Sequence, residues 1–325
     1  MTITVSQPRL YTPEERKYYV VVEKNPLPDW DYMREVTIDN TQNSNTLSDF
    51  QVQITLDTAS LISNGKMKSD CGDIRVYDPD KGSLLPYWVE TGTENTSSTR
   101  IWVKVPSIPG GGKKTIYLFY GNPGATSQSN GDDVFEVYED AESYPEGQEN
   151  PDDWSISETY GFNAGYWVKA TSTSYGGVDY GSRTVEVGGS RSDGSYEDVY
   201  VYAQKPVSIN AGDYKVEADI FFHYRNYDGK HGAKLQFGDV VVYQGNPFSG
   251  TGEINDWYHL SKTFTLSSDA STMKFGAYFN NLFSGDIYVA LDKMFVRKYA
   301  DPEPTTSVGA EQPGGDIKMK VERSW

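Results

Sequence analysis

The stretch IWVKVPSIPGGGKKTIYLFYGN, residues 101–122, decides the fold class. Ile101, Val103 and Val105 alternate with Trp102 and Lys104, and this period of two is typical of a strand with one buried face. The prolines and glycines of 106–112 favour a tight reversal of the chain. Residues 115–120 are apolar or aromatic at nearly every position, as in a strand that lies between two packed layers. The stretch therefore predicts a two-strand unit inside an antiparallel β-sandwich.

Strand-like runs continue on both sides of this unit. The first group has strands near 34–39, 50–56, 73–77, 85–90, 100–105 and 115–120, with one helical turn within 58–67. Residues 121–133 are rich in Gly, Ser, Asn and Asp and predict a linker. The second group has strands near 166–170, 183–188, 199–204, 213–224, 233–237, 239–243, 257–266, 272–279 and 286–298. Strands at this spacing, separated by turn residues, favour a second sandwich or jelly roll.

We therefore predict an all-β protein of two antiparallel β-sandwich or jelly-roll domains, 30–135 and 136–299, with extended arms at 1–29 and 300–325. The N-terminal arm has four prolines around one strand-like run, residues 17–23. Residues 316–325 alternate apolar and polar side chains, which predicts a final strand for which the chain offers no evident partner. Because proteins cover exposed strand edges, we expect at least one arm to contact another subunit.

Several short motifs resemble one known family. They are Trp30-Asp31-Tyr32, the runs FQVQITL (50–56), DIRVY (73–77) and LPYWVE (85–90), and Tyr120-Gly121-Asn122-Pro123. In this order they make residues 30–138 similar to the family called domain of unknown function 2341, and residues 297–312 resemble the tail that often ends its members. The resemblance implies a β-sandwich module of surface and extracellular proteins, often beside lectin-like modules. It transfers no catalytic residue, because the family has none established.

The opening and closing segments of the second domain, 137–147 and 286–296, resemble carbohydrate-binding modules of jelly-roll fold. In such modules an acidic residue near the first strand and an aspartate on the last strand often hold a structural calcium ion. The matching residues here are Glu139, Asp140 and Glu142 in the opening and Asp292 in the closing strand. Calcium takes about six to eight oxygen ligands, and a lone buried carboxylate is costly. The alternatives are a solvated acidic face and an Asp292 that caps a sheet edge.

Aromatic residues near the predicted loops of the second domain suit a sugar, whose C–H faces stack on aromatic rings. The segment Tyr224-Arg225-Asn226-Tyr227-Asp228 offers rings and polar partners within five residues, and Trp257 begins a later strand. We take Tyr224, Arg225, Tyr227, Asp228 and Trp257 as the candidate glycan-binding residues. The alternative is that these aromatic side chains belong to the core, as most aromatic residues on strands do.

Charge and composition exclude several function classes. The chain has 29 Lys and Arg against 46 Asp and Glu, a formal net charge of −17. It lacks the basic surface that nucleic acid or an anionic membrane requires. No run approaches the ~20 apolar residues of a membrane-spanning helix. The single cysteine, Cys71, excludes an intramolecular disulfide, and Asp70 and Asp73 beside it disfavour a reactive thiolate.

No Gly-x-Ser-x-Gly, phosphate-binding loop or His-Glu-x-x-His motif is present, and packed or solvated side chains are the better interpretation of His223, His231 and His259. We therefore predict that the protein is not an enzyme. The longest N-terminal apolar run, Tyr18–Val22, is shorter than the ~7–15 residues of a secretory signal. Either a signal was removed, or the protein leaves the host inside a particle.

We interpret the chain as a structural and attachment protein on the virion surface, a capsid or turret component of an archaeal virus. A secreted or cell-surface carbohydrate-binding protein or adhesin is the alternative, and a glycan-active enzyme is the third.

Overall fold

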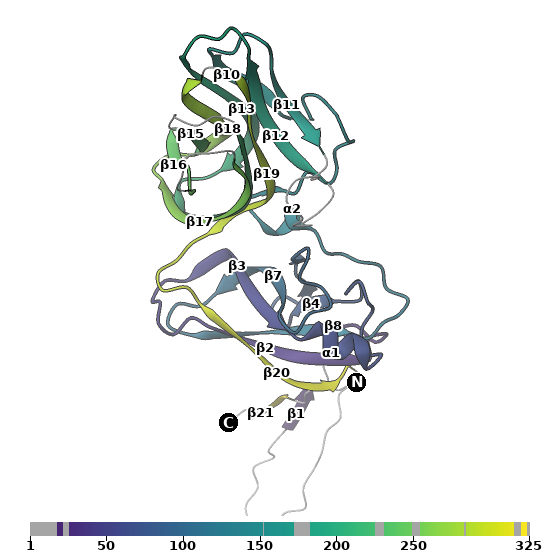
Figure 1. Cartoon of the computed structure of the whole chain (residues 1–325). Helices are drawn as coiled ribbons and strands as arrows, with labels where there is room; N and C mark the ends of the chain where they lie inside the picture. Colours follow the sequence, from purple (N-terminus) through teal and green to yellow (C-terminus); the bar gives the residue numbers. More distant parts are fainter. Residues whose placement is uncertain are drawn as a thin grey trace, which may run out of the picture.

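Two β-sandwiches stacked end to end make up the molecule (Figure 1). The computed structural model describes residues 18–21, 26–151, 153–171, 183–224, 231–248, 254–282, 284–314 and 320–323. Every strand pair in these residues is antiparallel, which confirms the predicted all-β fold.

The first sandwich consists of a five-stranded and a three-stranded sheet. The five-stranded sheet has the order β20 (Thr305–Pro313), β2 (Tyr32–Asp39), β8 (Lys113–Tyr120), β4 (Arg75–Asp78), β5 (Ser83–Leu84). The three-stranded sheet has the order β3 (Leu47–Leu56), β7 (Thr99–Ile108), β6 (Tyr87–Val89). Inward-facing residues of both sheets, among them Val36, Val103 and Leu118, form one core that the short helix α1 (Thr58–Ser63) joins through Leu61.

The two strands of the stretch 101–122 lie in opposite sheets. β7 pairs with β3 and β6, whereas β8 pairs with β2 and β4. The reversal at 109–112 therefore crosses from one layer of the sandwich to the other. Alternation shows that a strand has a buried face, but it does not show which strand lies beside it.

The C-terminal tail returns to the first sandwich as a strand. β20 pairs with β2 along its length, from Tyr32 opposite Pro313 to Asp39 opposite Thr305. The second sandwich is thus inserted between two parts of the first. In Figure 1 the yellow chain descends from β19 in the upper domain and continues along the lower domain as β20.

The second sandwich has two larger sheets. One has the order β10 (Ser155–Tyr160), β13 (Glu197–Ile209), β18 (Ala270–Leu282), β15 (His231–Phe237), β16 (Val240–Gly245). The other has the order β11 (Tyr166–Thr171), β12 (Thr184–Arg191), β19 (Gly285–Lys298), β14 (Gly212–Tyr224), β17 (Ile254–Leu266), and β9 (Val137–Glu139) pairs with β19. Their inward side chains, such as Val187, Phe222 and Phe275, fill the core. Strands β5, β9 and β10 had no counterpart in the sequence prediction.

An aromatic cluster joins the two sandwiches. Trp88 and Trp102 of the first sandwich pack on Val134, Phe135 and Phe295, and the Phe135 and Phe295 rings stack 4.4 Å apart. The predicted linker runs into this cluster through α2 (Gly131–Val134). Burying a large apolar side chain contributes about 1.5–3 kcal/mol, so the junction is a packed interface.

The Gln51 side chain also contributes hydrogen bonds at the domain boundary. The Gln51 amide donates to the Val134 carbonyl oxygen (2.9 Å) and accepts from the Lys298 backbone N–H (3.0 Å).

The terminal arms pair with each other. β1 (Tyr18–Val21) and β21 (Lys320–Arg323) form an antiparallel two-stranded sheet. The prediction that the last strand has no partner inside the chain is therefore wrong: the partner is the N-terminal strand, about 300 residues away and invisible to a local pattern. Residues 1–17, 22–25, 315–319, 324 and 325 lie outside the described residues.

Candidate functional site

The outer surface of the sheet β11-β12-β19-β14-β17 carries two adjacent rows of aromatic and polar side chains. Strand register places one row across the five strands: Trp167, Gly188, Tyr288, His223 and Asn255. The next row is Lys169, Glu186, Ala290, Phe221 and Trp257. Residues two positions apart share one face of a strand, and on four of the five strands the residue between them lies in the core: Val168, Val187, Val289 and Phe222. We call these ten residues the aromatic face.

Trp167 lies half-exposed at one edge of the aromatic face, and three neighbours hold its indole in place. Its Nε1 donates to Glu186 Oε1 (2.6 Å), and Glu186 is only 4% exposed. Lys169 Nζ bonds the same carboxylate (3.1 Å) and lies 5.1 Å from the indole centroid. A Cβ on Gly188 would come within 2.9 Å of Trp167 Cζ2, so the glycine leaves room for the ring.

Trp257 lies half-exposed toward the other edge. Its ring packs 5.3 Å from Phe221, which forms a small buried cluster with Tyr288 and Ala290. His223 stacks on Tyr288 at 4.2 Å and bonds the Asn255 amide oxygen through Nδ1. The aromatic face therefore has a buried apolar centre, two half-exposed indoles beside it, and hydrogen-bonding groups close to both.

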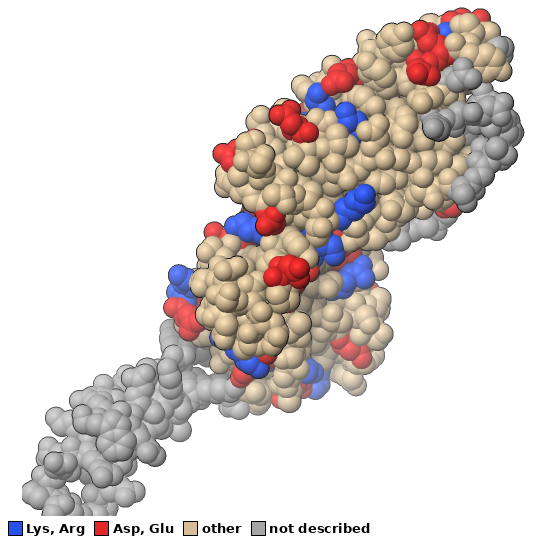
Figure 2. All heavy atoms as spheres, turned by 90° about the vertical axis from the view of Figure 1, so that its left-hand side faces the viewer, with Lys and Arg blue, Asp and Glu red and all other residues tan. Residues whose placement is uncertain are grey.

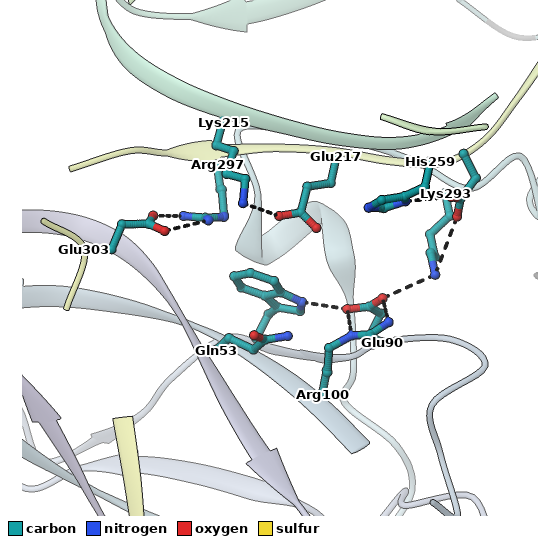
Figure 3. A pocket seen from close by; sticks show the side chains of 11 residues that line it. Gln53, Glu90, Arg100, Lys215, Glu217, His259, Lys293, Arg297 and Glu303 are labelled. Atoms are coloured by element: carbon teal, nitrogen blue, oxygen red, sulfur yellow. Dashed lines mark hydrogen bonds and ion pairs between the residues drawn. The ribbon is translucent and has the colours of Figure 1, made fainter. Parts of the chain in front are cut away.

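The aromatic face continues toward the first sandwich into a pocket of about 500 Å³ (Figure 3). Asp219 lies two positions before Phe221 on β14, His259 lies two positions after Trp257 on β17, and both line this pocket. We call it the junction pocket. Its lining residues are Gln53, Glu90, Arg100, Trp102, Lys215, Glu217, Asp219, His259, Lys293, Arg297 and Glu303. Figure 2 shows that charged side chains gather along the line where the two domains meet.

Glu90 is the acceptor at the centre of the junction pocket. Arg100 binds it through Nε (2.7 Å) and Nη2, and Trp102 Nε1 donates to it (3.0 Å). Lys293 Nζ reaches it across the domain boundary (3.2 Å). Although burial opposes ionisation, the hydrogen bonds from Arg100 and Trp102 and the charge of Lys293 lower the pKa of Glu90.

A β-bulge aims Lys293 into the junction pocket. Its φ is +36°, and the register of β19 against β14 shifts at this point. The buried Lys293 ammonium lies 3.8 Å from Asp219, whose carboxylate also bonds His259 Nδ1 (2.8 Å). The Asp219 carboxylate, which accepts this hydrogen bond, raises the pKa of His259 against the opposing effect of burial.

The candidate glycan-binding residues fall in different places. Trp257 belongs to the aromatic face, and its glycan-binding role stays a prediction. Tyr224 ends β14, in backbone register with Ile254 and Ile287. Arg225, Tyr227 and Asp228 lie outside the described residues, so their part of the prediction is untested.

Glu139, one of the predicted calcium ligands, is buried, and the ammonium group of Lys205 balances its charge. It accepts from Lys205 Nζ (2.6 Å), Trp154 Nε1 (3.1 Å) and the Tyr144 hydroxyl (3.2 Å). Asp140 accepts from the Tyr138 hydroxyl (2.9 Å), and with Glu142 it lines a second, acidic pocket of about 590 Å³ at the domain boundary.

Asp292, the fourth predicted ligand, is 1% exposed, and neither of its carboxylate oxygens has a hydrogen-bond partner among the described residues. Burial, helped by the charges of Asp219 and Glu142, raises its pKa to about 7. Within the described ranges no three His, Cys, Asp or Glu side chains gather as a metal site. Calcium binding stays a prediction.

Sequence reasoning missed Glu186, Gly188, Tyr288 and the junction pocket. Outward aromatic positions on the predicted strand 286–298 are a signal that could have found Tyr288. Glu186 and Gly188 become part of the aromatic face only through the register of β12 between β11 and β19, which no local pattern encodes.

Residues 70–157 match the family described as Domain of unknown function (DUF2341), which confirms the resemblance seen in the sequence. No curated protein matches the chain. No helix in the described part of the chain has the length and apolar character needed to cross a membrane.

Three solved structures illustrate the similar folds. A mannan-recognising carbohydrate-binding module, TmCBM27, is 11% identical, with 46% of this chain and 90% of that chain covered and a TM-score of 0.30. The K1 cleaved adhesin domain of Lys-gingipain from Porphyromonas gingivalis W83 is 13% identical, with 50% of this chain and 98% of that chain covered and a TM-score of 0.33. The C-terminal family 22 carbohydrate-binding module of Clostridium thermocellum Xyn10B is 13% identical, with 50% and 94% covered and a TM-score of 0.32.

Proposed function

We propose that this protein is a non-enzymatic attachment protein of an outer surface that binds a carbohydrate through the aromatic face. One observation carries the proposal. Two partly exposed indoles, Trp167 and Trp257, stand on one sheet face, and the buried groups between them include Glu186 and His223, which are both hydrogen-bonded. Binding sites for small molecules commonly combine aromatic walls with a few fixed polar groups in this way.

The chemistry of the aromatic face suits a sugar. A pyranose ring presents C–H groups that pack on an aromatic surface, while its hydroxyls both donate and accept hydrogen bonds. Near the indoles, Lys169 donates, Glu186 accepts, and the exposed Asn255 amide does both. Because Glu186 and Lys169 fix the Trp167 ring before any ligand arrives, little conformational entropy is lost on binding.

A glycan array tests the proposal directly. The intact protein should be retained on at least one carbohydrate, and Trp257→Ala should weaken that binding about tenfold, a loss of about 1.4 kcal/mol. Tyr160→Ala is the control, because Tyr160 is 52% exposed on the other sheet of the same sandwich. Equal binding by Trp257→Ala and the intact protein, with both folded, would overturn the proposal.

The surface that carries the protein is a separate question. Assignment to a virion stays a prediction, and the pairing of β1 with β21 removes the unpaired arm on which it relied. The mass of the native assembly tests it: a large symmetric particle would favour the virion, and a monomer would favour a cell-surface or secreted protein.

A further inference from the structure

The junction pocket lies directly in line with the aromatic face. Phe221 and Trp257 pair across β14 and β17, and Asp219 and His259 pair one step further along the same face. Two residues along a strand span about 7 Å, close to the length of one sugar ring. A glycan lying on the aromatic face and running along these strands therefore reaches the pocket with its next unit.

The first sandwich stands across this end of the face. Gln53, Glu90 and Arg100 face the second sandwich from the opposite side of the pocket, as Figure 3 shows. Trp102 closes the interior, with the Arg297 guanidinium 5.2 Å from its ring centroid. A glycan chain that enters the pocket from the aromatic face therefore meets the surface of the first sandwich, which blocks its further extension along the strands.

The carboxylates around the pocket are equal in number to its lysines and arginines, and they balance when His259 is neutral. Glu90, Glu217, Asp219 and Glu303 are matched by Arg100, Lys215, Lys293 and Arg297, and each carboxylate is in contact with a cation. A charged ligand would leave an unmatched charge in this pocket, which is costly in a partly buried site. Closely spaced donors and acceptors suit the hydroxyls of a neutral sugar.

We infer that the junction pocket binds the terminal sugar of a neutral glycan, so that both domains together recognise a chain end. This inference rests on the proposed function, because the aromatic face holds the rest of the chain. It assigns a ligand-binding role to the first sandwich, through residues such as Gln53 on β3.

The experiment counts binding sites against chain ends. Soluble xylan, galactomannan, dextran and hydroxyethylcellulose are titrated with the intact protein by calorimetry, before and after partial acid hydrolysis. Hydrolysis multiplies the ends while the mass of sugar stays constant. End recognition predicts that the sites per gram rise in proportion to the number of ends. Sites that follow mass alone would overturn the inference and leave the proposed function standing.

A matched pair of variants locates the end-binding site. Gln53→Ala should weaken binding to the hydrolysed probe roughly fivefold, the effect of losing one hydrogen bond. Gln244→Ala, an exposed glutamine on β16 of the other sheet, should bind like the intact protein. Equal affinity of the two variants, both with unchanged melting temperature, would overturn the pocket as the site. Failure of the intact protein to bind any of the four probes would count against the proposed function itself, and the inference would fall with it.

Discussion

The two outer faces of the second sandwich both carry aromatic rings, but they use them differently. On the β10-β13-β18 face, Tyr160 stacks on Tyr200 at 5.8 Å and Tyr200 on Tyr202 at 5.3 Å, with ring planes within 21° of parallel. Those rings cover one another. On the opposite sheet, Trp167 lies over Gly188 with its N–H fixed by Glu186 and Lys169 Nζ over its ring, and the side chain stays partly exposed.

The difference shows that the number of exposed aromatic residues does not identify a binding face. Tyr160 is more than half exposed, yet its partner occupies one side of its ring. What distinguishes Trp167 is that polar neighbours hold its partly exposed ring in place, whereas Tyr160 stacks on another ring. The two sheets also differ at the domain boundary, because only the sheet with the aromatic face continues into the junction pocket.

The largest contrast should appear when one carboxylate of an ion pair is removed from the junction pocket and, separately, one from the outer face of the β10-β13-β18 sheet. Glu90→Ala leaves the Lys293 ammonium, 6% exposed, without its closest carboxylate, and should cost about 3–5 kcal/mol of unfolding free energy. Glu158→Ala breaks an ion pair with Lys274 on the β10-β13-β18 face, where the two side chains are 43% and 24% exposed. This change should cost less than about 1 kcal/mol of unfolding free energy. Chemical denaturation of both variants measures the difference. Similar losses would mean that the junction charges are as solvated as the surface pair.

Asp292 should make the stability of the second sandwich depend on pH. Its pKa is about 7 in the folded protein, against an ordinary value of 3.8. The raised pKa means that the unfolded chain ionises first, so stability falls as pH rises from about 4 to about 7 and is then constant. In chelated buffer near pH 8, Asp292→Asn should be more stable than the intact protein by up to about 4 kcal/mol, and near pH 4 about equal. Asp239→Asn, in an exposed turn of the other sheet, should show no such change.

Calcium adds a second measurement to the same pair of proteins. If Asp292 helps to hold a calcium ion, as the sequence predicts, added calcium should raise the melting temperature of the intact protein and leave Asp292→Asn unchanged. No shift in the intact protein after thorough chelation and calcium addition would show that the calcium prediction is wrong.

Two glycine substitutions separate folding from binding. A Cβ at residue 188 would lie 2.5 Å from Tyr288 Cβ and 2.9 Å from Trp167 Cζ2, and a Cβ at residue 276 would lie 2.0 Å from the Val201 carbonyl oxygen. Gly188→Ala and Gly276→Ala should each cost about 1–3 kcal/mol. Only Gly188→Ala displaces an indole, so only it should weaken carbohydrate binding. Equal binding losses would mean that the effect of Gly188→Ala is general unfolding.

The smallest effect concerns one N–H group. Trp167→Phe removes the N–H that donates to Glu186, while the ion pair of Glu186 with Lys169 remains. The substitution should lower the free energy of unfolding by about 1 kcal/mol and the carbohydrate affinity a few-fold. Tyr200→Phe, on the β10-β13-β18 face, should leave carbohydrate binding unchanged. Thermal melting measures the stability of both variants, and glycan retention measures their binding. Unchanged binding by Trp167→Phe would show that the hydrogen bond to Glu186 is not needed to orient the ring for binding.

Local patterns were enough to predict most strands, because alternation and turn residues act within a few positions. They could not predict partners. β7 and β8 follow one another but belong to different sheets, and β21 pairs with a strand at the other end of the chain. Both facts depend on contacts between residues far apart in sequence.

The site was predictable only in part for the same reason. Trp257 could be chosen because its residue type and position near a predicted loop suit a sugar. Glu186 looks like any charged residue on a strand, and its buried role depends on Trp167 in the neighbouring strand. Asp292 and Lys293 are consecutive polar residues in an apolar strand, and such a break in alternation can indicate a bulge.

The return of β20 to β2 has a mechanical consequence. Tyr32 near the start of the first sandwich lies opposite Pro313 near its end, so both chain ends leave from the same corner of one domain. Tension applied between the termini would first separate β1 from β21, and then β20 from β2, one hydrogen-bonded pair after another, from that corner. While these strands separate, the force does not pass through the second sandwich. The aromatic face would therefore keep its shape while the chain that carries it is pulled.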